Sequence, residues 1–329
     1  MKSVVLQNKK AWLEDVPDPV AQDEYVVVRV ESTPICGSDR GAFLSEKPVY
    51  GAGHEGAGIV VDVDKSTLLK KGDRVVLNPL GGCGVCSYCL SGSYIFCQNT
   101  PPFYSHFAQY LKLQDFICTI LPEDISYDLG SMACCALGPA FSAARRMDLK
   151  AFDTLLITGL GPVGMGALCV AKFVGARVIG VDAVEFRKNM AAELGADLVL
   201  DAADPDILQK IREFARPGRM QRAIDASGNA AAERLCIDAM EPGGIVAFAG
   251  ENNKEIPIRP SADFIRKGLT LMGVWHYNIH DREQMLAMVR RSPLIPKLIT
   301  HTYGFTQVQE AFEKFNSIDV CKVVLHPWQ

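Results

Sequence analysis

The 329-residue chain lacks the features that would indicate a membrane or a nucleic-acid role. It has no run of 18 apolar residues, so no stretch is long enough to cross a bilayer as a helix. Its first residues, Met1 to Asn8, contain no apolar core of the kind found in a secretory leader. No basic tract occurs, and the formal net charge is only −4. We therefore expect a cytoplasmic protein whose partners are small molecules, not nucleic acid or membrane.

Internal repeats and low-complexity segments are also absent. A hydrophobic content of 48% with 22% charged residues is ordinary for a soluble globular protein, and the length suffices for two domains. Short runs of β-branched residues, such as Val26 to Val30 and Gly58 to Val63, predict a compact barrel of short strands in the first third. From Thr154 onward, apolar strands alternate with helical segments, which predicts a parallel sheet with helices on both faces.

The alternating pattern of this second region predicts elements with definite bounds. The expected strands are Leu155 to Thr158, Arg177 to Val181, Ala223 to Ala226, Ile245 to Ala249 and Leu269 to Trp275. The expected helices are Val163 to Val174, Glu185 to Leu194, Arg282 to Arg290 and Gln307 to Phe315, followed by a last strand, Val320 to Leu325.

Cysteine is not scarce, because the chain has 11. Four of them follow a C-x2-C-x2-C-x7-C spacing, at Cys83, Cys86, Cys89 and Cys97. This spacing places four thiolates around one tetrahedral zinc ion within a short lobe, whereas chance clustering or disulfides explain it poorly. A four-sulfur site has no open coordination position, so we expect this zinc to be structural.

A G-x-G-x-x-G pattern lies between an expected strand and an expected helix and comprises Gly159, Leu160, Gly161, Pro162, Val163 and Gly164. Such glycines permit a tight turn, and the free N–H groups at the start of the helix bind a pyrophosphate. Asp182 follows the next strand, where a carboxylate accepts hydrogen bonds from the adenosine ribose and repels a 2′-phosphate, which favours NAD over NADP. The alternative is a glycine turn that serves helix packing, beside a solvated Asp182.

Two basic residues are also assigned to the cofactor. Arg187 lies one helical turn beyond Asp182, where it either contacts the ribose or belongs to a solvated helix face. Lys322 lies in the last expected strand.

A second set of metal ligands lies in the β-rich part of the chain. Cys36 and His54 each lie on a turn, and Cys135 lies just before the nucleotide-binding region. Three protein ligands leave one coordination position open, which is the arrangement of a catalytic zinc. Taken singly, each would be read as structural, since a buried Cys is a small hydrophobe and a lone His is more often a packing or capping residue.

Taken in order, these motifs resemble those of the zinc-dependent medium-chain dehydrogenases of the alcohol dehydrogenase superfamily, and more closely their sorbitol and polyol dehydrogenase branch. The resemblance covers essentially the whole chain. The residues that carry it are Cys36-Gly37-Ser38-Asp39, Gly53-His54-Glu55 with Gly58, the four spaced cysteines, the glycine pattern with Asp182, and Leu298-Ile299-Thr300-His301 leading to Ala311-Phe312.

The resemblance implies an α/β fold in which a GroES-like β-barrel catalytic domain is interrupted by a Rossmann domain with a doubly wound parallel sheet. The expected bounds are 1–138 for the catalytic domain, with its zinc lobe at about 80–100, 139–276 for the NAD-binding domain, and 277–329 for the return to the catalytic domain. It also implies a homodimer or homotetramer, in which subunits pair through the strand at Leu269 to Trp275.

Carried over residue by residue, the resemblance implies that Cys36, His54 and Cys135 bind the catalytic zinc. Polyol dehydrogenases have a Glu-Pro pair where this chain has Cys135-Ala136, so the third ligand is similar to that of the simpler alcohol dehydrogenases. Cys134 is the rival, but adjacent residues on an extended segment point in opposite directions, so only one is expected to reach the metal.

Three further residues receive roles from the same resemblance. Asp39 is expected to hold the far nitrogen of His54. For Glu55, three roles stay open: a transient fourth ligand, a carboxylate behind the metal, or a structural acceptor. Ser38 is expected to take the proton of the substrate hydroxyl and pass it to a ribose hydroxyl.

The chain departs from the family pattern at two places. Many relatives have a histidine at the position of Gly41, so water, His106 or His276 is expected to complete the proton relay. The stretch from Thr100 to His106 lacks the Asp-Gly-Gly turn common in the family, which favours a wider substrate pocket.

Together these features predict a zinc-dependent oxidoreductase that transfers a hydride between NAD and a secondary alcohol, polyol or sugar-derived, with one catalytic and one structural zinc. A dehydrogenase of simple primary or secondary alcohols is the alternative within the enzyme class. A non-catalytic cofactor-binding protein on the same scaffold is a third hypothesis, and the retention of Cys36, His54, Cys135 and Ser38 argues against it. The sequence does not specify which alcohol is used.

Overall fold

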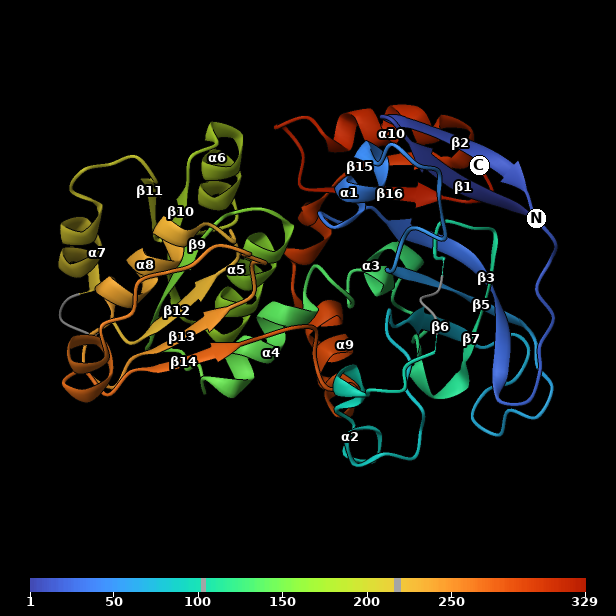
Figure 1. The fold of residues 1–329 in the computed structure, drawn as a ribbon, viewed down its shortest axis with the longest axis horizontal. Helices are drawn as coiled ribbons and strands as arrows, with labels where there is room; N and C mark the ends of the chain where they lie inside the picture. Colours follow the sequence, from blue (N-terminus) through green and yellow to red (C-terminus); the bar gives the residue numbers. More distant parts are fainter. Residues whose placement is uncertain (102–104, 216–219) are drawn as a thin grey trace. The chain divides into compact units, whose positions relative to one another are not determined.

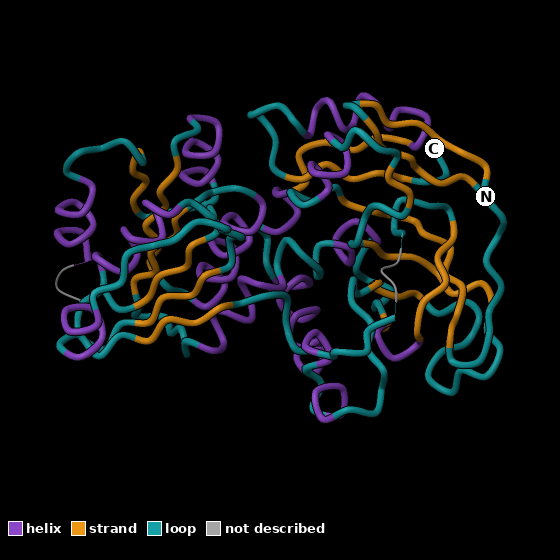
Figure 2. The backbone as a smooth tube through the Cα atoms, viewed as in Figure 1, coloured by secondary structure: helices purple, strands orange, loops and turns teal. Residues whose placement is uncertain are grey.

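The computed structural model describes residues 1–101, 105–215 and 220–329. The chain forms two compact units, each with its own sheets (Figures 1 and 2). The first unit comprises Met1–Cys135 and Asn278–Gln329, and the second comprises Ala136–Tyr277. The predicted loop difference at Thr100 to His106 lies in part outside the described residues. None of the described helices has the length and apolar character needed to span a membrane.

Two sheets build the first unit. The smaller is antiparallel with the order β2-β1-β4, formed by β1 (Lys2–Gln7), β2 (Lys10–Asp15) and β4 (Val49–Tyr50). The larger has seven strands in the order β15-β16-β3-β5-β6-β8, with β7 also paired to β3. Its strands are β3 (Tyr25–Pro34), β5 (Gly56–Asp62), β6 (Arg74–Leu77), β7 (Tyr110–Gln114), β8 (Cys118–Ile120), β15 (Ile299–Gly304) and β16 (Lys322–His326).

Strand β3 shows how the sequence builds this sheet and positions the site. Its side chains at Val26, Val28 and Val30 are all fully buried, which is the period of two expected for a strand. β3 pairs with β5, β7 and β16, so its path is fixed on several sides. The strand ends at Pro34, which places Cys36 at a defined point just beyond the sheet.

The helices of the first unit are short. They are α1 (Asp39–Leu44), α2 (Ser87–Leu90), α3 (Tyr127–Ser131), α9 (Arg282–Arg291) and α10 (Val308–Phe315), with 3-10 turns η1 (Tyr94–Phe96), η2 (Asp115–Ile117), η4 (Ile279–Asp281), η5 (Ile295–Leu298) and η6 (Phe305–Gln307). Helix α10 packs through Phe312, which stacks on Phe43 with ring centroids 5.2 Å apart and meets Phe107 edge-on at 5.7 Å. These rings join the end of the chain to its beginning.

The second unit is a six-stranded sheet in the order β11-β10-β9-β12-β13-β14, and all of its pairs are parallel. Its strands are β9 (Thr154–Thr158), β10 (Arg177–Asp182), β11 (Leu198–Asp201), β12 (Arg222–Asp225), β13 (Ile245–Phe248) and β14 (Thr270–Gly273). The helices are α4 (Gly138–Arg146), α5 (Pro162–Val174), α6 (Glu185–Glu193), α7 (Ile207–Ala215), α8 (Ala230–Ala239) and the π-helix η3 (Pro260–Ile265).

The predicted α/β class with a parallel sheet is confirmed. Helix α5 begins at Pro162, one residue before the predicted start, because a proline at the first helical position loses no intrahelical hydrogen bond. The last strand, predicted from Val320, begins only at Lys322, and the predicted strand Leu269 to Trp275 shortens to β14. Strand ends are where the ladder hydrogen bonds stop, and apolar side chains continue beyond them.

Candidate active site and metal centres

Four side chains that can bind a metal ion meet in the first unit, and they are Cys36, His54, Glu55 and Cys135. One donor atom of each lies within 4.8 Å of those of the others. Cys36 follows β3, His54 and Glu55 immediately precede β5, and Cys135 lies in the turn after α3. Two thiols and an imidazole are the donors that zinc prefers in proteins, so the predicted ligands are present together.

The structure distinguishes Cys135 from its neighbour Cys134. The Sγ atoms of Cys135 and Cys36 lie 3.5 Å apart. Cys134 is fully buried, and its thiol donates to the carbonyl oxygen of Leu77 at 3.3 Å. Residues 132–137 form turns rather than the extended segment that we expected, so the turn geometry, not strand alternation, separates the two thiols.

Asp39 connects the two turns that carry Cys36 and His54. Its carboxylate accepts hydrogen bonds from the backbone N–H of Cys36 at 2.8 Å and from that of Gly53 at 3.3 Å. One of its oxygens lies 3.6 Å from Nδ1 of His54. Because Asp39 is only 5% exposed, it can orient the imidazole with little competition from water.

Glu55 forms a buried ion pair with Lys322. The Nζ atom of Lys322 lies 2.6 Å from Oε1 of Glu55 and also donates to the carbonyl oxygen of Ile35 at 3.2 Å. The second oxygen of Glu55 accepts the backbone N–H of Cys135 at 3.2 Å. Burial raises the pKa of Glu55 to about 7 although Lys322 opposes the shift, and the neighbouring acidic groups raise the pKa of Lys322 against the effect of its burial.

The pairing of Lys322 with Glu55 escaped sequence reasoning, which assigned the lysine to the cofactor. Lys322 is fully buried beside the four-ligand group. The signal available in the sequence was a lysine inside the apolar run from Val320 to Leu325. A lysine is almost never fully buried unless it is paired with an acid, so such a run predicts a buried carboxylate.

The electrostatics of the group favour a cation at its centre. The side-chain contact with Cys135 holds the pKa of Cys36 well below its usual range, which favours the thiolate form that binds a metal ion. Burial opposes a charge on His54, yet Asp39 and Cys36 raise its pKa to about 11. The surroundings of the imidazole therefore stabilise positive charge, and the residues fit a divalent metal ion.

The residues assigned to the proton relay lie at different places. Ser38 precedes α1, is exposed and makes no capping hydrogen bond with its side chain. Gly41 lies on α1 with no atom within 4 Å of the position that a Cβ would take. His106 is fully buried, and its backbone N–H donates to the carbonyl oxygen of Gly53 at 3.2 Å. His276 belongs to the second unit.

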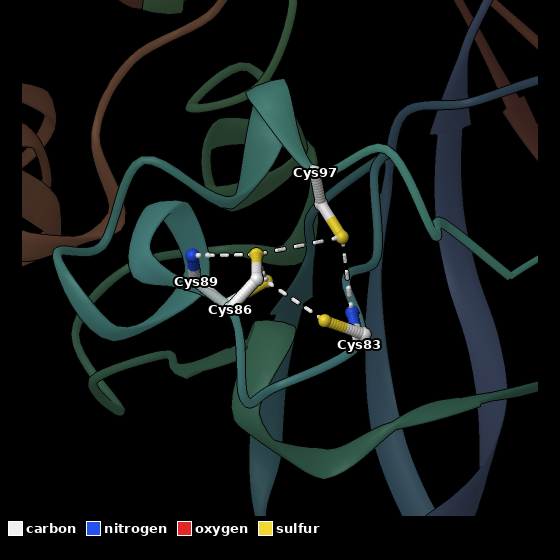
Figure 3. Close-up of side chains that lie close together, drawn as sticks. All are labelled: Cys83, Cys86, Cys89 and Cys97. Atoms are coloured by element: carbon white, nitrogen blue, oxygen red, sulfur yellow. Dashed lines mark hydrogen bonds between the residues drawn. The ribbon is translucent and has the colours of Figure 1, made fainter.

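The four spaced cysteines lie together in a separate lobe of the first unit, with their sulfur atoms turned toward one another (Figure 3). Cys83 and Cys86 flank a turn, Cys89 lies on α2, and Cys97 follows η1. The Sγ atoms of Cys86 and Cys89 are 3.5 Å apart, and those of Cys86 and Cys97 are 3.9 Å apart. Four thiolates complete the tetrahedral coordination of a zinc ion, so this group would leave no position for a further ligand.

Backbone N–H groups point at these sulfur atoms. Cys97 Sγ accepts from Cys83 N at 3.3 Å and from Asn99 N at 3.4 Å, and Cys86 Sγ accepts from Cys89 N at 3.5 Å. Hydrogen bonds from backbone N–H groups lower the pKa of Cys83 to about 6. Such donors stabilise thiolates, so this group also fits a zinc ion.

The glycine pattern forms the turn from β9 into α5 in the second unit. Gly159 has a φ of +83°, and Gly161 is the N-cap residue of the helix that Pro162 begins. A Cβ at Gly164 would lie 1.8 Å from the carbonyl oxygen of Gly159, so only glycine permits this close approach. Val163 follows in the first turn of α5, where the first N–H groups of a helix have no partner within the helix and are available to an anion.

Asp182 is tied to this turn rather than solvated. It ends β10 and is 7% exposed. Its carboxylate accepts the backbone N–H of Leu160 at 2.7 Å and that of Val184 at 2.8 Å. Arg187, on α6, places Nη1 3.7 Å from the same carboxylate. The acid therefore shapes the glycine turn, and each of its oxygens keeps capacity for a further donor.

Comparison with known proteins places this geometry in a family. Residues 22–123 match the model of the alcohol dehydrogenase GroES-like domain, and residues 162–291 match that of the zinc-binding dehydrogenases. The chain belongs to the zinc-type alcohol dehydrogenase family. The family predicted from the motifs is thus confirmed, whereas its sorbitol and polyol branch is not.

Relatives of this dehydrogenase match it over nearly its whole length. The uncharacterized zinc-type alcohol dehydrogenase-like protein YphC of Escherichia coli (strain K12) is 31% identical, over 97% of this chain and 96% of its own. The L-threonine 3-dehydrogenase of Shewanella baltica (strain OS185) has the same identity and coverage. The crystal structure of the alcohol dehydrogenase TADH from Thermus sp. ATN1 superposes with a TM-score of 0.90 at 26% identity, covering 99% of both chains.

Proposed function

We propose that this dehydrogenase oxidises secondary alcohols, polyol or sugar-derived, with NAD as the hydride acceptor, and holds one catalytic and one structural zinc. The observation that carries the proposal is the meeting of Cys36, His54 and Cys135 at one point, with Glu55 and Lys322 paired beside them. Three neutral or thiolate ligands around an open position are typical of a catalytic zinc, whereas the four-cysteine lobe is closed.

The residues around the ligand group have separate tasks in this reaction. Zinc bound by Cys36, His54 and Cys135 would act as a Lewis acid on the substrate hydroxyl. Asp39 holds the imidazole of His54 in one orientation through contacts that are almost fully buried. Ser38 lies two residues after Cys36 and is exposed, and we propose that its side chain accepts the proton that leaves the substrate hydroxyl.

The buried pair supports one of the three roles considered for Glu55. Because Lys322 and the N–H of Cys135 each occupy one oxygen of Glu55, we assign this carboxylate to a position behind the metal. Its hydrogen bond to the backbone of Cys135 holds that ligand's turn in place. Lys322 balances the charge of the carboxylate, which a buried site requires.

The glycine turn and Asp182 support a dinucleotide in the second unit. The start of α5 would bind the pyrophosphate, and the carboxylate of Asp182 would accept the ribose hydroxyls. The residue that follows is Ala183, which offers no positive charge to a 2′-phosphate. These features favour NAD, whose nicotinamide would accept the hydride.

The substrate class is supported by the relative whose name describes its reaction. L-Threonine 3-dehydrogenase acts, by its name, at carbon 3 of threonine, which carries a secondary hydroxyl. Similarity over 97% of this chain supports a secondary over a primary alcohol. L-Threonine itself therefore belongs among the substrates to be tested, beside polyols and simple alcohols.

The test is a screen for NADH formation at 340 nm with purified enzyme, using polyols, sugar alcohols, simple secondary and primary alcohols and L-threonine. A secondary alcohol should give the highest kcat/KM. His54→Ala should lose this activity, whereas Cys118→Ala, which changes a buried cysteine outside both ligand groups, should retain it. Equal rates for the parent and His54→Ala would contradict the assignment of the site, and preference for a primary alcohol would contradict the substrate class.

We also expect subunits to pair along β14. Among the described strands, β14 ends the sheet and is paired on one side only, with β13. An exposed strand edge carries unpaired backbone groups and invites a second copy. Light scattering should give the mass of a dimer or tetramer for the parent. Leu271→Pro should shift the mass toward that of the monomer. An unchanged mass in this variant would contradict pairing at this edge.

A further inference from the structure

Three turns meet at the carboxyl ends of neighbouring strands in the second unit, after β9, β12 and β13. The strand order reverses direction between β9 and β12, since β10 and β11 lie on one side and β13 and β14 on the other. In an open parallel sheet, ligands bind outside the carboxyl ends of the strands at this reversal. Asp182 lies on the β10 side, which takes the adenosine half. The nicotinamide half then belongs on the β12 side.

Asp225 is the last residue of β12, and its side chain is fully buried. Its Oδ1 accepts hydrogen bonds from the hydroxyls of Thr158 at 2.7 Å and Ser227 at 2.6 Å. Its Oδ2 accepts the backbone N–H of Gly228 at 3.0 Å. An ionised carboxylate is an acceptor only, and burying it is costly unless such donors surround it.

The backbone of Asp225 reaches the third turn. Its carbonyl oxygen accepts the N–H groups of Ala249 at 2.8 Å and Gly250 at 3.0 Å, directly after β13. Thr158, which its side chain binds, is the last residue of β9 and precedes the glycine turn. One residue therefore holds hydrogen bonds to all three strand ends.

The turn after β12 is in close backbone contact with each of the other two turns. A Cβ at Gly159 would lie 2.7 Å from Cα of Ser227, and a Cβ at Gly250 would lie 2.2 Å from the backbone N of Gly228. Because glycine has no side chain, the backbones of these turns approach so closely that little space is left for them to rearrange. The turn at Ser227 is thus packed between the turn after β9 and the turn after β13.

We propose that Asp225 is a positioning residue for the nicotinamide half of the bound dinucleotide. The inference rests on the proposed use of NAD. Asp225 fixes the three turns in one arrangement before the cofactor arrives, and a surface that is already ordered binds without a further loss of conformational entropy. We assign the adenosine half to Asp182 and the start of α5, and none of the hydrogen bonds of Asp225 described above reaches either of them.

The test compares binding of NAD with binding of AMP, which contains only the adenosine half. Asp225→Asn keeps the shape of the side chain but turns one acceptor into an N–H donor, which opposes the N–H of Gly228 or a hydroxyl. We expect the Kd of NAD, measured by calorimetry, to rise by roughly tenfold to a hundredfold, the equivalent of one hydrogen bond to a charged group. The Kd of AMP should change less than about twofold.

A matched control is available at the opposite side of the sheet. Asp201 ends β11 and accepts the backbone N–H of Ala203 at 2.9 Å. Asp201→Asn makes the same chemical change at a strand end remote from the reversal in strand order. Both dissociation constants should stay at the values of the parent.

A second variant keeps the test decisive if Asp225→Asn does not fold. Ser227→Ala removes one hydroxyl donor and leaves the carboxylate paired to Thr158 and Gly228, so a smaller loss of NAD affinity with unchanged AMP affinity is expected. Equal losses of NAD and AMP affinity, or no loss of either in a folded variant, would overturn the inference alone. A parent protein that binds AMP but neither NAD nor NADP would overturn the proposed function and this inference with it.

Discussion

Lys322 and Glu55, which are 267 positions apart in the chain, form an ion pair with both side chains fully buried. A buried pair contributes little net stability when compared with apolar residues, but removal of one partner leaves a charge without compensation. A variant that replaces only Lys322 or only Glu55 should therefore destabilise the protein more than a variant that replaces both.

The first prediction concerns this pair. Lys322→Met should lower the free energy of unfolding by about 3–5 kcal/mol, because Glu55 then lacks its partner in the interior. Adding Glu55→Gln should restore part of that loss. Urea unfolding followed by circular dichroism measures both, with the partly exposed pair Lys314 and Asp319 as a control in which Lys314→Met changes little. A double variant less stable than Lys322→Met would contradict the interpretation.

The second prediction concerns the two ligand groups. Metal analysis of the purified protein should give two zinc ions per chain. Cys83→Ala should lose one of them together with much of the stability, since zinc binding by model peptides amounts to about 10–16 kcal/mol at neutral pH. His54→Ala should lose the other together with activity. A single zinc that disappears with Cys83→Ala but not with His54→Ala would contradict the catalytic site.

The third prediction concerns the choice of cofactor. The parent should have a higher kcat/KM with NAD than with NADP, because the carboxylate of Asp182 repels a 2′-phosphate. Combining Asp182→Ala with Ala183→Arg should move the preference toward NADP. Asp182 also accepts the N–H of Leu160, so Asp182→Asn is the milder control that keeps one acceptor at this turn. Equal kcat/KM for both cofactors in the parent would show that Asp182 does not face the ribose.

The fourth prediction concerns the proton relay. Ser38→Ala should lower the rate of alcohol oxidation by roughly 10²- to 10⁴-fold without changing the zinc content. Gly41→His should be tolerated sterically, since no atom lies within 4 Å of the Cβ position, and it should raise the rate near neutral pH. Steady-state rates between pH 6 and 10 test both. Full activity in Ser38→Ala would require another route for the proton.

The alternative ends of the relay are tested by His106→Ala and His276→Ala. If solvent completes the relay, each variant should keep most of the activity and the pH profile of the parent. A lost rate with an altered pH profile in either one would identify that histidine as the end of the relay.

The fifth prediction concerns the pair His326 and Asp128, whose side chains are 2.9 Å apart and 20% and 31% exposed. The hydrogen bond with Asp128 raises the pKa of His326, and His326 lowers the pKa of Asp128 although burial opposes this. The histidine contributes stability below its unfolded pKa of about 6.5, and loses it as the pH rises through the raised value. The acid contributes above about 3.9 and loses its share as the pH falls.

The pair should therefore stabilise the protein most at about pH 4 to 6.5. His326→Gln should lower the unfolding free energy by up to about 1 kcal/mol at pH 5 and by less at pH 9, since the pair is partly solvated. Urea unfolding at both pH values measures this, with His280→Gln, at an exposed histidine, as the control. A difference that grows from pH 5 to pH 9 would contradict the assignment.

Much of the fold could be predicted from the sequence because the patterns that indicate it are local. The period of two in β3, the glycine turn before α5 and the spacing of Cys83 to Cys97 each depend on a few neighbouring residues. Local patterns of this kind have local physical causes, such as the free N–H groups at a helix start or four sulfurs on one metal.

Contacts between distant segments were harder to predict. The motifs suggested that Cys36, His54 and Cys135 meet, but nothing near Glu55 in the sequence indicates that its partner lies at Lys322. The same holds for Asp225, which lies inside the predicted strand Ala223 to Ala226 and accepts a hydrogen bond from Thr158 of another strand. Such pairings depend on the order of the strands in the sheet, and no single segment of the sequence determines that order.

The pairing of β16 with β3 has a consequence for the order in which the protein matures during synthesis. The second unit is one continuous stretch, Ala136–Tyr277, so all of it can leave the ribosome and fold while the chain is still growing. Strand β3 is translated early but can pair with β16, and Glu55 with Lys322, only after the whole second unit has been translated. The residues Cys36, His54 and Cys135 are therefore translated long before Lys322, and their group gains its buried cation only after the second unit has been made.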